Sequence, residues 1–334
     1  MTKKQMIWWK KMTNFNNNSF KEIAAEFEKA DSILLFPHML PDGDAIGSCG
    51  ALCHMLRKMG KTAYILIEDP VPKYLAFLEK DMCTFDMNII DEPDICACID
   101  CGEVERFAKR KAAFEKGKIK ICIDHHATSK PFTDFSHISP EAAATGELIF
   151  KLLKEFPAEP DEYVGEALFA AITTDTGNFQ YSNTTKQTHL ITAELYDLGF
   201  DHNKVSVELY ENIGVARMLI NGRALDNMEI FAGGKAAVAY VTQKMLDEAG
   251  AEMDDTEGII QSLRSISGVE IAVLLKELSD GRIKAGMRAK TTANVAEICS
   301  RFGGGGHVKA AGCSLDGTLE EAKALIMKEV EASL

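Results

Sequence analysis

Apolar runs of strand length alternate with helical stretches through the first half of this 334-residue chain, and this alternation limits the fold more than any other feature. The runs are Ser32–Phe36, Ala63–Ile67, Ile95–Ile99 and Ile119–Ile123, and amphipathic stretches such as Ala45–Met59 and Glu103–Phe114 separate them. Alternating strands and helices predict a doubly wound, mainly parallel sheet. Runs without strict alternation of apolar and polar residues suit strands that are buried on both faces.

Two further segments belong to the same half of the chain. Ala142–Phe156 predicts a helix that ends before Pro157. Tyr163–Thr174 is apolar throughout, and periodicity alone leaves it open whether this segment is a helix or a strand.

The second half has a different pattern. Two helical stretches over 186–227 are expected to connect two domains. Beyond them, Asp280-Gly281 between two apolar segments is a strong hairpin signal, and a last helix begins at Leu319. We expect four parts, which are an N-terminal extension (1–19), the doubly wound α/β domain (20–185), a helical connector (186–227) and a smaller α/β domain (228–334).

The charge balance limits the partners. Lys plus Arg total 37 and Asp plus Glu total 50, so the formal net charge is 37 − 50 = −13. Wrapping long nucleic acid or lying on an anionic membrane needs basic surface, so neither is expected. A nucleotide in one local basic pocket, or carboxylates around cations, would fit this charge. The chain has no 18-residue apolar window, and Met1–Lys11 is a poor secretory signal, so we expect a cytoplasmic protein.

The nine cysteines also agree with a cytoplasmic location. An odd number of cysteines in a chain of this length is typical of a protein whose thiols stay reduced. Cys96, Cys98 and Cys101 have a spacing that a metal site could use. Two of them lie within the apolar run Ile95–Ile99, which has the length of a buried strand. We interpret these cysteines as buried apolar side chains.

Aspartate and histidine follow the apolar runs of the first domain at four points. They are His38, Asp42 and Asp44 after the first run, Asp100 after the third, Asp124, His125 and His126 after the fourth, and Asp175 after Tyr163–Thr174. Because ligands bind at the carboxyl ends of the strands in an open parallel sheet, we expect these side chains to converge. Each motif alone has a plainer explanation; Asp44, for example, suits an N-cap of the helix that begins at Ala45.

Together the four motifs favour a metal centre. Carboxylates brought together destabilise one another's charged forms unless something positive neutralises them, and these motifs contain no lysine or arginine. Aspartate oxygens and histidine nitrogens without thiolate favour Mn²⁺, Mg²⁺ or Co²⁺. The ligands are too many for one ion, so we expect two divalent ions, with Mn²⁺ preferred. Two ions bridged by a carboxylate, with a deprotonated water between them, suit attack at phosphorus.

These blocks resemble the four motifs of the DHH phosphoesterase superfamily, and Gly303–Gly312 resembles the glycine-rich motif of the DHH-associated C-terminal domain. The resemblance runs from about Phe20 to the C-terminus. The chain has a length similar to that of the compact members of one branch of this superfamily, the bifunctional oligoribonucleases (nanoRNases) and 3′-phosphoadenosine 5′-phosphate (PAP) phosphatases.

The resemblance implies a role for each of these residues of the first domain. His38 and Asp42 would hold one metal and Asp44 and His125 the other, with Asp100 bridging and Asp175 completing the ligand set. His126 would face the scissile phosphate as an acid or as a charge stabiliser, and Asp124 would orient a histidine.

In the second domain the resemblance implies substrate binding by Arg288, Gly303, Gly304, Gly305, Gly306, His307 and Lys309. Four consecutive glycines expose N–H groups that can surround a phosphate, although such a run also suits a flexible end of a helix. The family often has serine where Ala289 stands, so one hydroxyl contact to the phosphate is absent here.

The expected function is hydrolysis of short oligoribonucleotides, about two to five nucleotides long, to mononucleotides and of PAP to AMP, by a metal-bridging hydroxide. The second domain would bind the far end of a short substrate, so few phosphates need be contacted and long nucleic acid is excluded. A cyclic di-AMP or pApA phosphodiesterase is the alternative, and no residue separates the two. A non-catalytic nucleotide-binding protein is disfavoured by the complete ligand set. The sequence leaves a homodimer open.

Overall fold

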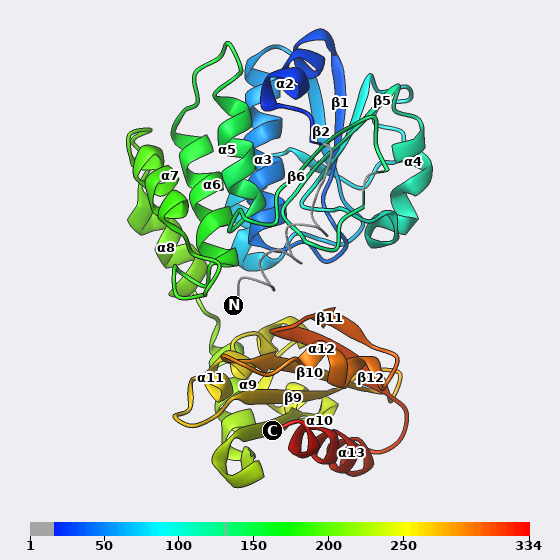
Figure 1. Cartoon of the computed structure of the whole chain (residues 1–334), viewed down its shortest axis with the longest axis vertical. Coiled ribbons are helices and arrows are strands. Elements are labelled where there is room, and N and C mark those ends of the chain that lie inside the picture. Colours follow the sequence, from blue (N-terminus) through cyan, green and yellow to red (C-terminus); the bar gives the residue numbers. More distant parts are fainter. Residues whose placement is uncertain (1–16, 131) are drawn as a thin grey trace, which may run out of the picture. The chain divides into compact units, whose positions relative to one another are not determined.

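The computed structural model describes residues 17–130 and 132–334 (Figure 1). The chain forms two compact units, the first ending at Asn212 and the second running from Ile213 to Leu334. Most of the predicted N-terminal extension, residues 1–16, lies outside the described residues. No helix of the described ranges is long and apolar enough to cross a membrane.

The first unit is built on a six-stranded sheet with the order β3-β2-β1-β4-β5-β6, in which every neighbouring pair is parallel. The strands are β1 (Ser32–Phe36), β2 (Thr62–Leu66), β3 (Cys83–Thr84), β4 (Ile95–Ile99), β5 (Ile119–Asp124) and β6 (Phe135–Ile138). The predicted doubly wound parallel sheet is therefore confirmed. Since β1, β4 and β5 are neighbours, their carboxyl ends lie side by side at one edge of the sheet.

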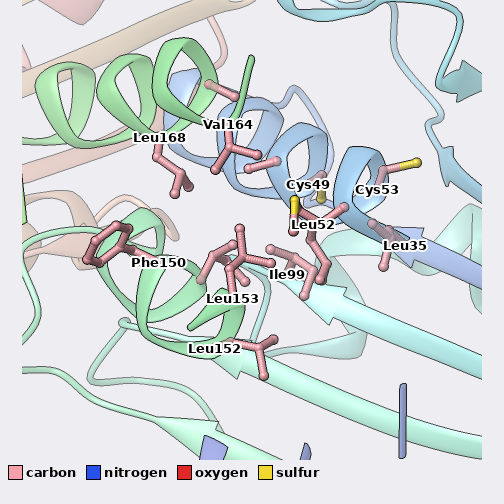
Figure 2. Packing of buried hydrophobic residues seen from close by; sticks show 14 of the residues in the cluster. Leu35, Cys49, Leu52, Cys53, Ile99, Phe150, Leu152, Leu153, Val164 and Leu168 are labelled. Atoms are coloured by element: carbon pink, nitrogen blue, oxygen red, sulfur yellow. The ribbon is translucent and has the colours of Figure 1, made fainter. Parts of the chain in front are cut away.

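Helices cover both faces of this sheet (Figure 1). The helices on one face are α2 (Phe20–Lys29), α3 (Gly43–Lys58), α5 (Thr145–Leu153) and α6 (Glu162–Asp175). The short helix η1 (Lys73–Leu78) contributes to the same hydrophobic core. The helices on the other face are η2 (Val104–Arg110) and α4 (Lys111–Glu115). Figure 2 shows Leu52 of α3, Leu153 of α5 and Val164 of α6 meeting beside Ile99 of β4. The segment whose periodicity was ambiguous is thus a helix, α6.

The opposite face of the sheet carries Cys96 and Cys98, which are fully buried as expected for apolar side chains. Burial raises the pKa of Cys96 to about 12, so the thiol stays protonated. The prediction of a single helix over Glu103–Phe114 is wrong in detail. The segment is divided into η2 and α4 at Arg110, which leaves helical geometry, and η2 itself is kinked at Phe107, whose ring packs against Phe36 and Phe114.

Helices α3 and α6 approach each other at glycines. An added Cβ at Gly47 would lie 2.3 Å from the carbonyl oxygen of Ala167, and one at Gly43 would lie 2.4 Å from Oγ1 of Thr174. Only a residue without a side chain allows this spacing. The close approach matters because α3 begins directly after Asp42 and α6 ends at Asp175.

The predicted connector is divided between the two units. Helices α7 (Lys186–Tyr196) and α8 (His202–Tyr210) pack on α6 of the first unit. Helix α9 (Val215–Asp226) packs on β8, α10 and α11 of the second unit.

The second unit contains a six-stranded sheet with the order β11-β12-β10-β9-β8-β7, antiparallel except for the parallel pair β8 and β9. Its strands are β7 (Glu229–Phe231), β8 (Ala236–Val241), β9 (Ile271–Glu277), β10 (Ile283–Ala289), β11 (Gly305–His307) and β12 (Ala310–Leu315). Its other helices are η3 (Ala232–Gly234), α10 (Gln243–Ala249), η4 (Met253–Thr256), α11 (Ile259–Ser265), α12 (Val295–Ser300) and α13 (Leu319–Ala332). The predicted hairpin at Asp280-Gly281 joins β9 and β10.

Replacing Gly47 by alanine should destabilise the first unit by about 1–3 kcal/mol, because the new methyl group meets backbone of α6. Gly222, inside α9, faces open space, and Gly222→Ala should be neutral or stabilising by up to about 1 kcal/mol. Urea unfolding of both variants measures the difference. Equal unfolding midpoints for Gly47→Ala and the unchanged protein would contradict the close approach.

Candidate metal centre

The aspartates and histidines predicted from the sequence meet at the carboxyl edge of the first sheet. His38, Asp42 and Asp44 follow β1, Asp100 follows β4, and Asp124, His125 and His126 stand at or just after the end of β5. Asp175 follows a segment whose type the sequence left open, and it is the last residue of helix α6. The contact between α3 and α6 brings it to the site.

Possible ligand atoms form three groups, and within each group the atoms lie within 4.8 Å of one another. The groups are His38, Asp42 and Asp100; Asp44, His125 and Asp175; and Asp100, His125 and His126. Asp100 connects the groups through its two oxygens. Its Oδ2 lies 3.5 Å from Nε2 of His38, and its Oδ1 lies 3.6 Å from Nε2 of His125.

The spacing of these atoms suits ligands of a shared cation. His38 Nε2 lies 3.6 Å from Oδ2 of Asp42, and His125 Nε2 lies 3.7 Å from Oδ2 of Asp44 and 3.7 Å from Oδ2 of Asp175. Hydrogen bonds would be about 2.7–3.2 Å long. Two ligands about 2.1 Å from one ion, about 90–120° apart, are separated by about 3.0–3.6 Å. The atoms therefore face a common point more than they face each other.

All three histidines use Nδ1 for a protein acceptor. His38 Nδ1 lies 2.7 Å from the carbonyl oxygen of Met39, His125 Nδ1 lies 3.3 Å from that of Ala142, and His126 Nδ1 lies 2.8 Å from Oδ1 of Asp124. A carbonyl oxygen only accepts, so in the neutral form of His38 and His125, the form that binds a metal, the proton sits on Nδ1. Nε2 then carries the lone pair that binds a metal.

Asp42 has two tasks at the start of α3. Its Oδ1 accepts hydrogen bonds from the N–H groups of Asp44 and Ala45, both 3.1 Å long, which makes Asp42 the N-cap. Its Oδ2 faces His38. The plainer explanation of Asp44 as the cap is therefore wrong, since the helix begins at Gly43 and Asp44 is inside it.

The electrostatics of the site call for positive charge. Burial, together with the charge of Asp100, raises the pKa of Asp44 well above its usual value. Burial raises the pKa of Asp175 to about 6, and Asp100 and Asp42 add to this shift while His125 opposes it. Burial lowers the pKa of His38, but Asp100 and Asp42 outweigh it and raise that pKa to about 10. Carboxylates this crowded, next to histidine nitrogens, fit divalent cations.

Asp124 lies behind the histidines. Its Oδ1 accepts from the N–H of His125 at 2.9 Å as well as from His126, and its Oδ2 accepts from the hydroxyl of Ser129. A Cβ at Gly102 would lie 2.3 Å from Asp124 Oδ2, so the glycine makes room for this carboxylate. Sequence reasoning missed Ser129, because a serine in a loop carries no signal of its partner.

The glycine-rich segment of the second unit borders a cavity of about 460 Å³. Gly303, Gly304, Gly305 and Gly312 line it together with Lys284, Phe302, Cys313 and Ser314. At Gly304 a Cβ would lie 2.2 Å from the carbonyl oxygen of Gly312, and Gly306 has φ +140°, so both positions require glycine. Lys284 was missed, although alternation along β10 puts it on the same face as Arg288.

The expected phosphate donors of the second unit differ in their surroundings. Lys309 donates from Nζ to the carbonyl oxygens of Thr291 and Ala293, so it stabilises the loop before α12 instead of presenting an unengaged ammonium group. Arg288 is half-buried on β10 and donates to the carbonyl oxygen of Met287. Ala289 is buried in the core, on the other face of β10 from Arg288. The side chain of His307 lies outside what the structure describes.

Comparisons with known proteins identify relatives of both units. The model of the DHH family, N-terminal domain, matches residues 32–186, and that of the DHHA1 domain matches residues 233–334. The bifunctional oligoribonuclease and PAP phosphatase NrnA of Thermus thermophilus is 30% identical, over 98% of this chain and 95% of that protein. The cyclic-di-AMP phosphodiesterase PdeA of Listeria monocytogenes is 26% identical, over 91% of this chain and 48% of that protein.

The fold also has a counterpart among solved structures. An exopolyphosphatase-related protein from Bacteroides fragilis superimposes with a TM-score of 0.89 and is 27% identical, over 94% of this chain and 95% of the other.

Mn²⁺ should stabilise the protein against heat, by about 2.7 kcal/mol for each bound ion at a concentration one hundred times its dissociation constant, and a chelator should remove the gain. Asp100→Asn should lose most of this gain while being at least as stable as the unchanged protein in chelator. The amide removes a buried charge but can still accept the hydrogen bond at Oδ1, and asparagine tolerates the φ of +57° found at Asp100.

Asp81→Asn is the matched control, because Asp81 also has φ +57° but is exposed and belongs to none of the ligand groups. Thermal unfolding with Mn²⁺ and with chelator measures all three proteins. The metal centre would be contradicted if Asp100→Asn were stabilised by Mn²⁺ as much as Asp81→Asn.

Proposed function

Since this chain belongs to the DHH family and is a hydrolase acting on phosphoester bonds, we propose that it cleaves short oligoribonucleotides to mononucleotides and converts PAP to AMP. The relative from Thermus thermophilus is named for both activities, and the similarity covers nearly the whole of both chains. The observation that carries the proposal is Asp100, whose two oxygens face two separate groups of ligand atoms.

Two divalent ions, with Mn²⁺ preferred, would be held at this site. His38 and Asp42 would bind one ion, Asp44, His125 and Asp175 would bind the other, and Asp100 would bridge them. When bound, such ions neutralise the carboxylates, polarise the phosphate and lower the pKa of an attacking water.

The side chains around these ligands would orient and complete the reaction centre. Asp124 accepts the hydrogen bond from His126 Nδ1 at 2.8 Å, which fixes the ring. His126 then presents Nε2, and in its protonated form it would stabilise the charge that develops on the phosphate. Burial lowers the pKa of His126, but the Asp124 hydrogen bond and the Asp100 charge outweigh it and raise that pKa above its usual value.

The second unit would bind the phosphate or base of a short substrate. Gly303, Gly304 and Gly305 line the cavity that Lys284 also lines. The N–H groups of Gly303 and Gly304 already donate to the carbonyl oxygens of Ser300 and Cys299, so the positive charge of Lys284 would be the main attraction for a phosphate there. Arg288 would add a guanidinium from the same face of β10. A short substrate needs few such contacts, which agrees with the net charge of −13.

A cyclic di-AMP or pApA phosphodiesterase is the second candidate, and the relative PdeA favours it. The chain spans about half of that relative's length, so the likeness covers only part of that protein.

The test is a substrate panel with Mn²⁺, made of 5′-phosphorylated RNAs from two to about 24 nucleotides, PAP, cyclic di-AMP and pApA. We expect the highest kcat/KM for the shortest RNAs, cleavage of PAP, and a loss of more than about 100-fold in Asp100→Asn with Asp81→Asn unaffected. Efficient cleavage of cyclic di-AMP or of pApA alone would favour the second candidate. Binding of these nucleotides without any hydrolysis would contradict both.

A further inference from the structure

Helix α5 begins against the metal-ligand carboxylates and has no cap of its own. Its N-cap residue is Ala144, which offers no side-chain hydrogen bond. The first N–H groups of a buried helix need acceptors, and alanine is a poor residue at this position. The acceptor here is Asp44 of α3, which binds the N–H of Thr145 through Oδ2 at 2.7 Å and the N–H of Gly146 through Oδ1 at 2.9 Å.

Thr145 also reaches a second carboxylate. Its hydroxyl Oγ1 donates to Oδ1 of Asp100 at 2.8 Å, and the whole residue is fully buried. One residue thus binds Asp44, from α3, through its backbone and Asp100, from the end of β4, through its side chain. A carboxylate oxygen has two lone pairs, so Asp100 Oδ1 can accept this hydrogen bond and still bind a cation.

The arrangement has a physical reason. Asp44 and Asp100 repel each other when both are charged and buried, and the charge of Asp100 contributes to raising the pKa of Asp44. Asp100 is further held in left-handed backbone geometry, with φ +57°. Donors at a helix N-terminus favour negative charge, and a hydroxyl at fixed distance limits rotation of the Asp100 carboxylate.

We propose that Thr145 is a positioning residue of the metal centre, which sets the orientation of Asp100 relative to Asp44 so that the two Asp100 oxygens face the two ligand groups. The inference rests on the proposed two-ion phosphoesterase site. Thr145 forms hydrogen bonds with two of the proposed ligands, Asp44 and Asp100, and would contact neither the ions nor the substrate. It would therefore influence the affinity for Mn²⁺ and the value of kcat.

Two variants isolate the hydroxyl group. Thr145→Val has nearly the same volume and shape and keeps the backbone N–H to Asp44, but it loses the donor to Asp100. Thr145→Ser keeps the donor and loses a methyl group. Both are measured as chelator-treated full-length protein, by calorimetric titration with Mn²⁺, by kcat and KM for a dinucleotide at saturating Mn²⁺, and by thermal unfolding in chelator.

We expect Thr145→Val to bind Mn²⁺ about 10- to 100-fold more weakly and to lower kcat with little change in KM, while Thr145→Ser stays near the unchanged protein. A purely structural role would lower the unfolding temperature in chelator and leave the Mn²⁺ affinity unchanged.

The outcomes separate this inference from the function on which it rests. Equal Mn²⁺ affinity and stoichiometry in Thr145→Val and the unchanged protein would overturn the positioning role alone. Equal weakening in Thr145→Ser and Thr145→Val would also overturn it, because the loss would then follow the packing and not the hydroxyl. If the unchanged protein bound no Mn²⁺, the proposed function would fall and this inference with it.

Discussion

Repulsion between buried carboxylates is the constraint on which the first unit depends. Asp44 and Asp100 are nearly inaccessible to water, and Asp42 and Asp175 stand beside them. Such a cluster is unstable as a set of charges unless donors and cations compensate it. The protein supplies donors from the N–H groups of α5, the hydroxyl groups of Ser48 and Thr145 and the histidine rings. The carboxylate oxygens and histidine Nε2 atoms of the cluster are spaced as ligands of divalent cations would be.

The fold around the cluster brings these groups together from distant parts of the sequence. The parallel order of β1, β4 and β5 collects three of the motifs at one edge. The glycines of α3 let α6 approach closely enough for Asp175 to join them. Asp44 then binds the start of α5, so a residue that faces His125 also satisfies the backbone of a neighbouring helix. The same interactions thus stabilise the fold and prepare the site.

The sequence predicts those features that depend on local pattern. The strands could be predicted because burial on both faces leaves continuous apolar runs, and the ligand residues because they follow those runs. Asp175 could not be assigned to a helix, since Tyr163–Thr174 is apolar in either geometry. The positioning role of Thr145 and the carbonyl contacts of Lys309 depend on tertiary proximity, which residue spacing does not encode. The division of 186–227 between the two units likewise depends on which core each helix packs against.

The central claim is that Asp100 stands between two cations. Anomalous diffraction from crystals of the full-length protein grown with Mn²⁺ tests it most directly. The account predicts two peaks about 3.5–4 Å apart, one beside His38 and Asp42 and one beside Asp44, His125 and Asp175, with Asp100 in contact with both. A single peak, or two peaks of which only one touches Asp100, would contradict it.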